Sequence, residues 1–178
     1  AIEAGGKFTQ EGTGQALRAV ELAKCDLTTH MVQEFPELQG VVGGLYARAQ
    51  GEPAVVADAI YDHYRPQGME DRCPRTVVGA VVSLAAKIDS LAGGFVAGYE
   101  PSGSSDPFGL RRHGTGIIKV LVECLLPIRL KKIALKSMDS FESKLTKSRV
   151  VVMKAVVDFL EDRLRFYLET GLKFRYDT

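Results

Sequence analysis

The sequence predicts an all-α fold. Apolar residues recur every three or four positions through most of the 178 residues, as they do along one face of an α-helix. No segment keeps the alternation of apolar and polar residues that marks a half-buried strand. Prolines and glycines interrupt the helical pattern where helices are expected to begin or end. Together these observations favour a helical bundle.

The N-terminal part is expected to contain a loose segment and two helices. Residues 1–14 contain four glycines, which predicts a flexible or frayed segment. The spacing of apolar residues predicts a first helix over 15–33. Pro36 is expected to begin a second helix, since a proline in the first turn loses no helical hydrogen bond. Three glycines of that helix would let another backbone approach closely: Gly40, Gly43 and Gly44.

Two more helices are predicted in the first half of the chain. Pro53 begins the shorter one and Pro66 ends it. His63, near the C-terminus of that helix, is expected to interact favourably with the helix dipole. A polar loop then leads to Thr76, which can cap a long helix over 77–96 whose apolar side chains form one stripe.

A turn-forming segment leads into the fifth predicted helix. Residues 98–107 are rich in Gly, Ser and Pro, which is typical of turns. We expect Asp106 as the N-cap and Pro107 as the first residue of a helix that reaches about residue 126. Arg111 and Arg112 lie in its first turn, where positive charges oppose the helix dipole. They are expected either to bind an anionic partner, such as RNA phosphates, or to form salt bridges within the protein.

Two long helices are expected after Pro127. Apolar periodicity predicts one over 130–147 and another over 150–170, with Gly171 as the C-terminal stop. The three valines at 150–152 would also suit a short strand, but the helical pattern continues through them.

The composition is ordinary for a soluble globular protein, with 46% hydrophobic and 25% charged residues. No uninterrupted apolar run reaches the roughly 18 residues that a membrane span needs, and no signal peptide is recognisable. The three cysteines are odd in number and lack metal-ligand spacing, which favours free thiols in a reducing cytoplasm. No phosphate-binding glycine loop or nucleophile motif occurs, and the three histidines are too scattered to predict a metal site.

The net charge of +1 conceals an uneven distribution of charged residues. Residues 1–130 have 12 Lys and Arg against 15 Asp and Glu, whereas residues 131–178 have 11 against 7. A basic second part suits a polyanionic partner, although a solvated helix face can have the same excess. The first residue is not Met and the chain stops close behind a helix, so we expect it to be part of a longer protein.

Four motifs follow one another along the chain. They are Lys-Cys-Asp-Leu at 24–27 continuing into 31–40, Tyr64-Arg65-Pro66, Ala-Ala-Lys-Ile-Asp-Ser-Leu at 85–91, and Gly-Ser-Ser-Asp-Pro-Phe-Gly-Leu-Arg-Arg at 103–112. In this order they resemble the beta subunit of bacterial glycyl-tRNA synthetase, the heterotetrameric type. A helical segment at 159–168 is also similar, and the resemblance extends from about residue 22 to residue 177.

The resemblance implies a helical bundle of the HD-domain type over 15–129, followed by a connector of two long helices over 130–178. HD phosphohydrolases hold a divalent metal with a His, an adjacent His–Asp pair and a distant Asp. Cys25 and Asp26 occupy the place of the pair here, and Ala86 occupies that of the distant Asp. A single carboxylate cannot hold a metal alone. The resemblance therefore implies a degenerate site without hydrolase activity.

Two other hypotheses follow from the same residues. The first is a metal-dependent HD-type phosphohydrolase, in which His30 or His63 would join Asp26 as a ligand. The second is a helical protein-interaction module, which would bind through the glycine-rich second helix or through the 98–107 segment.

The resemblance implies a role in the attachment of glycine to tRNA(Gly), which uses ATP and Mg²⁺, in a cytoplasmic heterotetramer of two alpha and two beta subunits with no membrane association. Amino-acid activation belongs to the alpha subunit, so we expect no catalytic residue and no bound cofactor in this chain. We expect the chain to contact tRNA and to act as a scaffold. Its charges predict RNA contacts at six basic residues: Arg111, Arg112, Lys119, Arg129, Lys131 and Lys132.

Overall fold

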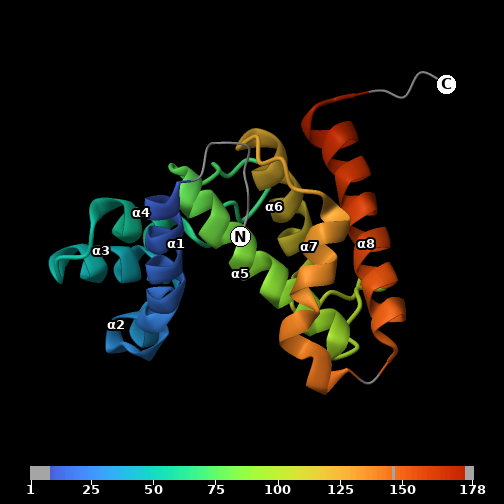
Figure 1. Cartoon of the computed structure of the whole chain (residues 1–178), viewed down its shortest axis with the longest axis horizontal. Coiled ribbons are helices and arrows are strands. Elements are labelled where there is room, and N and C mark those ends of the chain that lie inside the picture. Colours follow the sequence, from blue (N-terminus) through green and yellow to red (C-terminus); the bar gives the residue numbers. More distant parts are fainter. Residues whose placement is uncertain (1–8, 146, 175–178) are drawn as a thin grey trace. The chain divides into compact units, whose positions relative to one another are not determined.

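The computed structural model of the chain describes residues 9–145 and 147–174, and every regular element among them is a helix (Figure 1). The all-α prediction is therefore confirmed. Packing divides the chain into unit 1 (residues 1–66 and 71–86) and unit 2 (residues 67–70 and 87–178). These packing units divide the chain at a different place from the HD-like domain and connector implied by the resemblance.

Unit 1 contains short helices joined by tight turns. In chain order these are α1 (Gln10–Leu22), a 3₁₀ helix (Cys25–Thr28), α2 (His30–Glu34), a 3₁₀ helix (Pro36–Leu38), α3 (Val41–Ala49), α4 (Ala54–Asp62) and the first half of α5 (Val77–Val96). Helix α4 packs against both α1 and α3.

The helix predicted over 15–33 is wrong in its extent. Thr9 begins α1 earlier, because its side-chain oxygen accepts a hydrogen bond from the backbone N–H of Gly12 at 3.1 Å. Helix α1 therefore enters the segment predicted to be frayed, of which residues 1–8 lie outside the described residues. The helix ends at Leu22, and Lys24 follows with φ +69°, a left-handed conformation that no α-helix continues through. Thr29 then caps the separate helix α2.

The second predicted helix also begins later than expected. Pro36 begins only a 3₁₀ turn, and Gly40 follows with φ +82° before α3 starts at Val41. A left-handed residue interrupts the helical hydrogen bonds, which is why the proline does not begin α3 itself.

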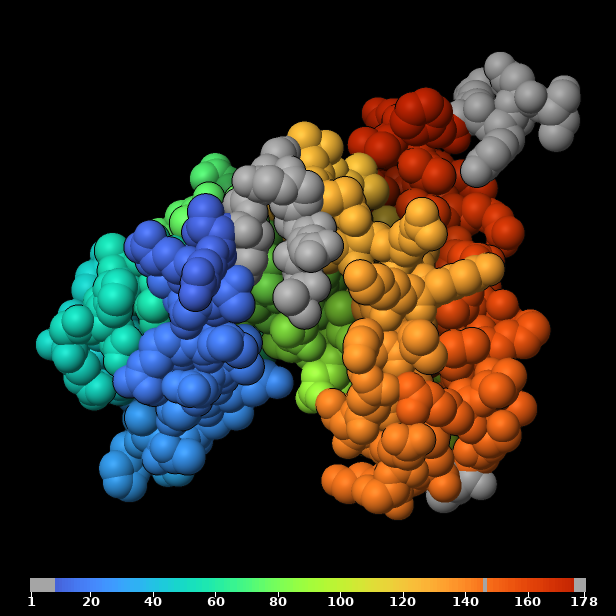
Figure 2. Space-filling view, viewed as in Figure 1, coloured from blue at the N-terminus to red at the C-terminus, as the bar shows by residue number. Residues whose placement is uncertain are grey.

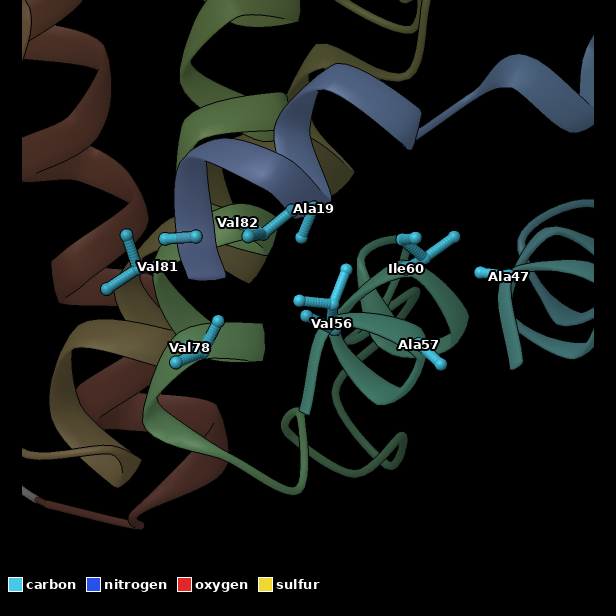
Figure 3. Packing of buried hydrophobic residues seen from close by; sticks show 10 residues of the cluster. Ala19, Ala47, Val56, Ala57, Ile60, Val78, Val81 and Val82 are labelled. Carbon is cyan, nitrogen blue, oxygen red and sulfur yellow. The ribbon is translucent and has the colours of Figure 1, made fainter. Parts of the chain in front are cut away.

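The core of unit 1 is built from small side chains on four helices (Figure 3). Small residues let the helix axes approach closely, so a well-packed core forms without aromatic side chains. The cluster comprises Ala16, Ala19, Ala47, Val56, Ala57, Ala59, Ile60, Val78, Val81 and Val82.

Helix α5 has the bounds predicted for it, and Thr76 is its cap, as expected. The Thr76 hydroxyl oxygen accepts a hydrogen bond from the backbone N–H of Gly79 at 3.0 Å. Among the described helices, α5 alone is long and apolar enough to cross a membrane. Sequence analysis did not predict this, because polar residues interrupt the apolar run within the helix. Half of its apolar window is buried inside the protein.

Unit 2 combines the second half of α5 with three further helices that run side by side in Figure 1. The elements are α6 (Leu110–Glu123), α7 (Leu130–Ser137), a 3₁₀ helix (Asp139–Lys144), α8 (Arg149–Phe166) and a π-helical turn (Tyr167–Gly171). Helix α8 packs against both α6 and α7.

Two predicted boundaries in unit 2 need correction, and one open alternative is decided. Helix α6 begins at Leu110, because Gly109 has φ +63° and is the N-cap in place of Asp106. The helix predicted over 130–147 ends at Ser137 and continues only as a 3₁₀ helix. The valines at 150–152 lie in the first turns of α8, so the strand alternative for them is wrong.

Candidate functional site

The segment before α6 is a closed turn. Ser102 and Ser105 pair through their backbones, with N···O distances of 3.1 and 2.8 Å. Gly103, between them, has φ +52°, a conformation that glycine adopts without strain. The turn is therefore held by main-chain bonds before any side chain contributes.

Asp106 and Arg111 tie this turn to α6. The Asp106 carboxylate accepts hydrogen bonds from the backbone N–H groups of Leu110 at 2.7 Å and Arg111 at 2.9 Å. The Arg111 guanidinium donates to the carbonyl oxygens of Gly103 at 2.8 Å and Ser105 at 3.3 Å. Asp106 thus satisfies the helix start without being the N-cap residue. Arg111 stabilises the turn through carbonyl groups, in place of the predicted salt bridge.

Arg112 differs from its neighbour. Its side chain is exposed, and among the described residues it has no ion pair or hydrogen bond. A guanidinium nitrogen of Arg112 lies 3.2 Å from the position that a Cβ at Gly109 would occupy. The Arg112 side chain therefore folds back along the N-terminal end of α6.

A second group of free cations lies at the start of α7. Arg129, Lys131 and Lys132 are exposed, and none has a carboxylate partner among the residues described in the structure. Helix α7 lies on the face of the molecule that Figure 2 shows, where it is orange. Along the chain, most of helix α6 lies between Arg112 and this group; the helix is roughly 20 Å long, at 1.5 Å per residue over its 14 residues.

Lys119 is buried, unlike the other five predicted RNA contacts. Its ammonium group donates to the carbonyl oxygen of Met69 and lies 3.2 Å from a carboxylate oxygen of Glu123. The Tyr167 hydroxyl donates to the same Glu123 oxygen at 2.8 Å. Lys119 is therefore an internal structural group of unit 2, and its side chain does not reach the RNA-accessible surface.

Replacing Lys119 with methionine is expected to destabilise the protein by about 1–3 kcal/mol, because the partly buried carbonyl of Met69 loses its donor. Urea unfolding measures this loss. Lys154→Met is the matched control, since the exposed pair of Lys154 with Asp158 should contribute less than about 1 kcal/mol. Equal losses in the two variants would contradict the structural role of Lys119.

Residues of the first two sequence motifs meet at Asp26 in unit 1. The Asp26 side chain is only 3% exposed, and its Oδ2 accepts a hydrogen bond from the backbone N–H of Gly40 at 2.6 Å. A Cβ at Gly43 would lie 3.1 Å from the Asp26 carboxylate. A Cβ at Gly40 would lie 2.7 Å from the ring of Tyr64. The glycines at positions 40 and 43 are therefore explained by the close approach of Tyr64 and Asp26.

Burial raises the pKa of the Tyr64 hydroxyl, and the nearby negative charge of Asp26 adds to the rise. A hydrogen bond with Gln39 opposes this effect. Tyr64 is consequently a neutral hydroxyl at physiological pH, packed beside a buried carboxylate.

The described residues include no group of three His, Cys, Asp or Glu side chains placed to hold a metal ion. The Cys25 thiol is exposed and donates to the carbonyl oxygen of Glu21 at 3.6 Å. His30 is also exposed, at the start of α2. His63 is buried at the C-cap of α4, where its Nδ1 donates to the carbonyl oxygen of Ile60 at 2.6 Å.

Sequence reasoning missed an ion pair in unit 1 between the buried Asp62 and the half-exposed Arg75. Asp62 is 1% exposed, and its carboxylate accepts from the Arg75 guanidinium at 2.8 and 3.3 Å and from the Arg75 backbone N–H at 3.0 Å. The hydrogen bond to Asp62 is the main cause that raises the pKa of Arg75. The guanidinium carbon also lies 5.0 Å from the ring centroid of Tyr61. This pair fixes the polar loop that follows α4.

Sequence reasoning also missed a pocket in unit 2. Its volume is about 480 Å³, and its lining includes Asp89, Tyr99, Phe108, His113 and Phe141. The available signal was a pair of aromatic residues on either side of a turn-rich segment, close to two arginines.

The chain matches the family of the glycyl-tRNA synthetase beta subunit over residues 2–178. It is 48% identical over 161 residues to the glycine–tRNA ligase beta subunit of Acidobacterium capsulatum, covering 90% of this chain and 22% of that protein. It is 43% identical over 163 residues to the same subunit of Shouchella clausii, covering 90% of this chain and 23% of that protein. It is 41% identical over 171 residues to the same subunit of Acaryochloris marina, covering 96% of this chain and 24% of that protein. The chain thus spans less than a quarter of the length of these relatives. It belongs to the glycyl-tRNA synthetase beta subunit family.

Proposed function

We propose that this chain is a non-catalytic, tRNA-contacting and scaffolding part of a glycine–tRNA ligase beta subunit. It would support the ATP- and Mg²⁺-dependent attachment of glycine to tRNA(Gly), in the cytoplasm and together with an alpha subunit in a heterotetramer. The observation that carries the proposal is the group of exposed cations at Arg129, Lys131 and Lys132, which have no carboxylate partner among the described residues. Lysine and arginine side chains of this kind neutralise RNA phosphates and release their counterions.

We further propose that unit 1 keeps a degenerate HD-type site as a structural element. One carboxylate oxygen of Asp26 accepts a hydrogen bond from the backbone N–H of Gly40, which supports a structural role for Asp26. Cys25 faces solvent, and the place of the distant Asp is taken by Ala86 on α5. This set of residues does not fit the ligand chemistry of a divalent metal, which favours scaffold over hydrolase.

The test compares two triple variants of the full-length beta subunit, assembled with its alpha partner. Replacing Arg129, Lys131 and Lys132 with alanine is expected to raise the Michaelis constant for tRNA. The slope of log affinity against log salt should fall by about 2–3, since each phosphate contact contributes somewhat less than one. Aminoacylation and RNA binding at several salt concentrations measure these effects.

The control removes three cations of unit 2 that are already paired with carboxylates: Lys147, Lys154 and Arg165. This second triple alanine variant should leave the salt slope close to that of the wild type, because these charges are compensated within the protein. Equal slopes and equal Michaelis constants in both triple variants would remove α7 as an RNA-contacting surface.

A further inference from the structure

The pocket of unit 2 has aromatic walls. The rings of Tyr99 and Phe108 lie 4.7 Å apart between centroids with planes inclined at 59°, and each residue is about half exposed. Phe141 contributes a third ring to the lining. The volume of about 480 Å³ lies within the range of small-molecule sites. Exposed aromatic rings beside a cavity of this size offer faces on which a flat ligand can stack.

Small residues of α5 form another wall of the pocket. Gly93, Gly94 and Ala97 line it on successive turns. A Cβ at Gly93 would lie 3.3 Å from the Phe141 ring, and a Cβ at Gly94 would lie 2.7 Å from the Leu110 side chain. The Phe141 ring and the Leu110 side chain therefore approach the helix backbone directly, and a larger residue at Gly93 or Gly94 would displace them.

The aromatic pair is held in place before any ligand arrives. Tyr99 and Phe108 stand on either side of the turn that the Ser102–Ser105 backbone pair closes. Asp106 and Arg111 bind the same turn to the start of α6. A stacking site that is already ordered loses little conformational entropy on binding.

The charges around the pocket favour a base inside it and a phosphate outside it. Asp89 is exposed in the lining, and among the described residues no cation pairs with it. Its carboxylate would repel a phosphate and accept hydrogen bonds from the amino group of cytosine or adenine. Uracil presents a carbonyl oxygen at the corresponding position. Outside the pocket, the free guanidinium of Arg112 lies against Gly109, next to Phe108, where it can meet the phosphate.

We propose that this pocket binds an unpaired, amino-bearing base of the RNA, stacked on Tyr99 and Phe108, with Asp89 reading its amino group and Arg112 its phosphate. The inference rests on the proposed RNA-contacting function and extends it, because the cations of α7 recognise only the backbone. Unit 2 would then contact RNA in two ways. The cations at the start of α7 would bind phosphates, and the pocket at the start of α6 would bind one unpaired base.

The test uses the full-length enzyme and fluorescently labelled RNA hairpins of one duplex sequence. One hairpin is blunt, and the others have a short single-stranded tail of C, A or U. The wild-type protein should bind the C- and A-tailed hairpins about 10-fold more tightly than the blunt one, with a smaller gain for the U tail. Tyr99→Ala and Phe108→Ala should each abolish most of this gain. Asp89→Ala should remove the preference for C and A over U.

Phe174→Ala is the matched control, because Phe174 is an exposed aromatic residue of unit 2 outside the pocket lining. It should leave the gain intact, and unchanged melting temperatures would show that the pocket variants fold. A tail preference that survives Tyr99→Ala and Phe108→Ala overturns the pocket proposal. If the α7 triple variant still flattens the salt slope in that case, the RNA-contacting function stands. Pocket variants that bind all hairpins normally but lose the alpha subunit would identify a protein-binding pocket and would also overturn the proposal.

Discussion

Replacing Arg75 with alanine is expected to lower the free energy of unfolding by about 3 kcal/mol. The Asp62 carboxylate is almost completely buried, and Arg75 supplies its closest guanidinium, at 2.8 Å. Without it, the buried carboxylate would keep only the backbone N–H of residue 75 and the more distant Arg65 at 3.8 Å. The loss is placed at the lower end of the range for broken buried pairs because those two partners remain and because the Arg75 side chain is half exposed. Urea unfolding followed by circular dichroism measures it.

Arg48→Ala provides the matched control for this prediction. Arg48 pairs with Asp58, which Arg75 also approaches, but the Asp58 side chain is 24% exposed whereas that of Asp62 is 1% exposed. Exposed pairs of this kind contribute less than about 1 kcal/mol. If Arg75→Ala and Arg48→Ala destabilise the protein equally, the Asp62–Arg75 pair does not stabilise unit 1 in the way its geometry implies.

Gly44→Ala is expected to be the most damaging single-methyl addition in unit 1, at about 3 kcal/mol. An added Cβ would lie 2.6 Å from the Cβ of Tyr61 and 2.8 Å from the carbonyl oxygen of Ala57. These neighbours belong to the backbone of α4 or lie next to it, so relief requires that α3 and α4 move apart. The same thermal or urea unfolding experiment gives the loss.

Gly14→Ala is the matched control for Gly44→Ala, because it adds the same methyl group to a helix at a position without close neighbours. Gly14 lies inside α1, and nothing lies within 4 Å of the position that its Cβ would occupy. Alanine there should stabilise the protein by about 0.5–1 kcal/mol, because alanine loses less backbone entropy in a helix. Opposite signs for the two variants are the expected result. A neutral Gly44→Ala would mean that the contact between α3 and α4 tolerates expansion.

The helices that sequence analysis placed well are those with strong local signals. Helix α5 has a threonine cap and a long apolar stripe, and its predicted bounds are those observed. Helix α1 was misplaced because its end depends on the left-handed Lys24, a residue type that carries no signal for that conformation. The pattern of apolar residues continues across Lys24, so periodicity alone joined two helices that the backbone separates.

The motifs were found from the sequence, but their roles were not. Sequence analysis predicts only a helix start for residues 36–40 of the first motif, yet the backbone N–H of Gly40 donates to the buried Asp26. Sequence analysis predicts the same role for both arginines of the fourth motif, yet Arg111 closes a turn whereas Arg112 has no partner among the described residues. Adjacent residues on a helix point in different directions, and only the surrounding loop decides which of them finds carbonyl groups.

The sequence by itself determined the all-α class, the core helix α5 and membership of the glycyl-tRNA synthetase beta subunit family, because these depend on periodicity and on motifs that are local in the chain. Tertiary structure alone decided which basic residues can face a partner. Lys119 and Lys131 look equivalent in the sequence, but Lys119 meets the carbonyl of Met69, fifty residues away, and is buried. Burial of a charge depends on groups that folding brings together from distant positions, and the local pattern of residues in the sequence does not predict which groups these are.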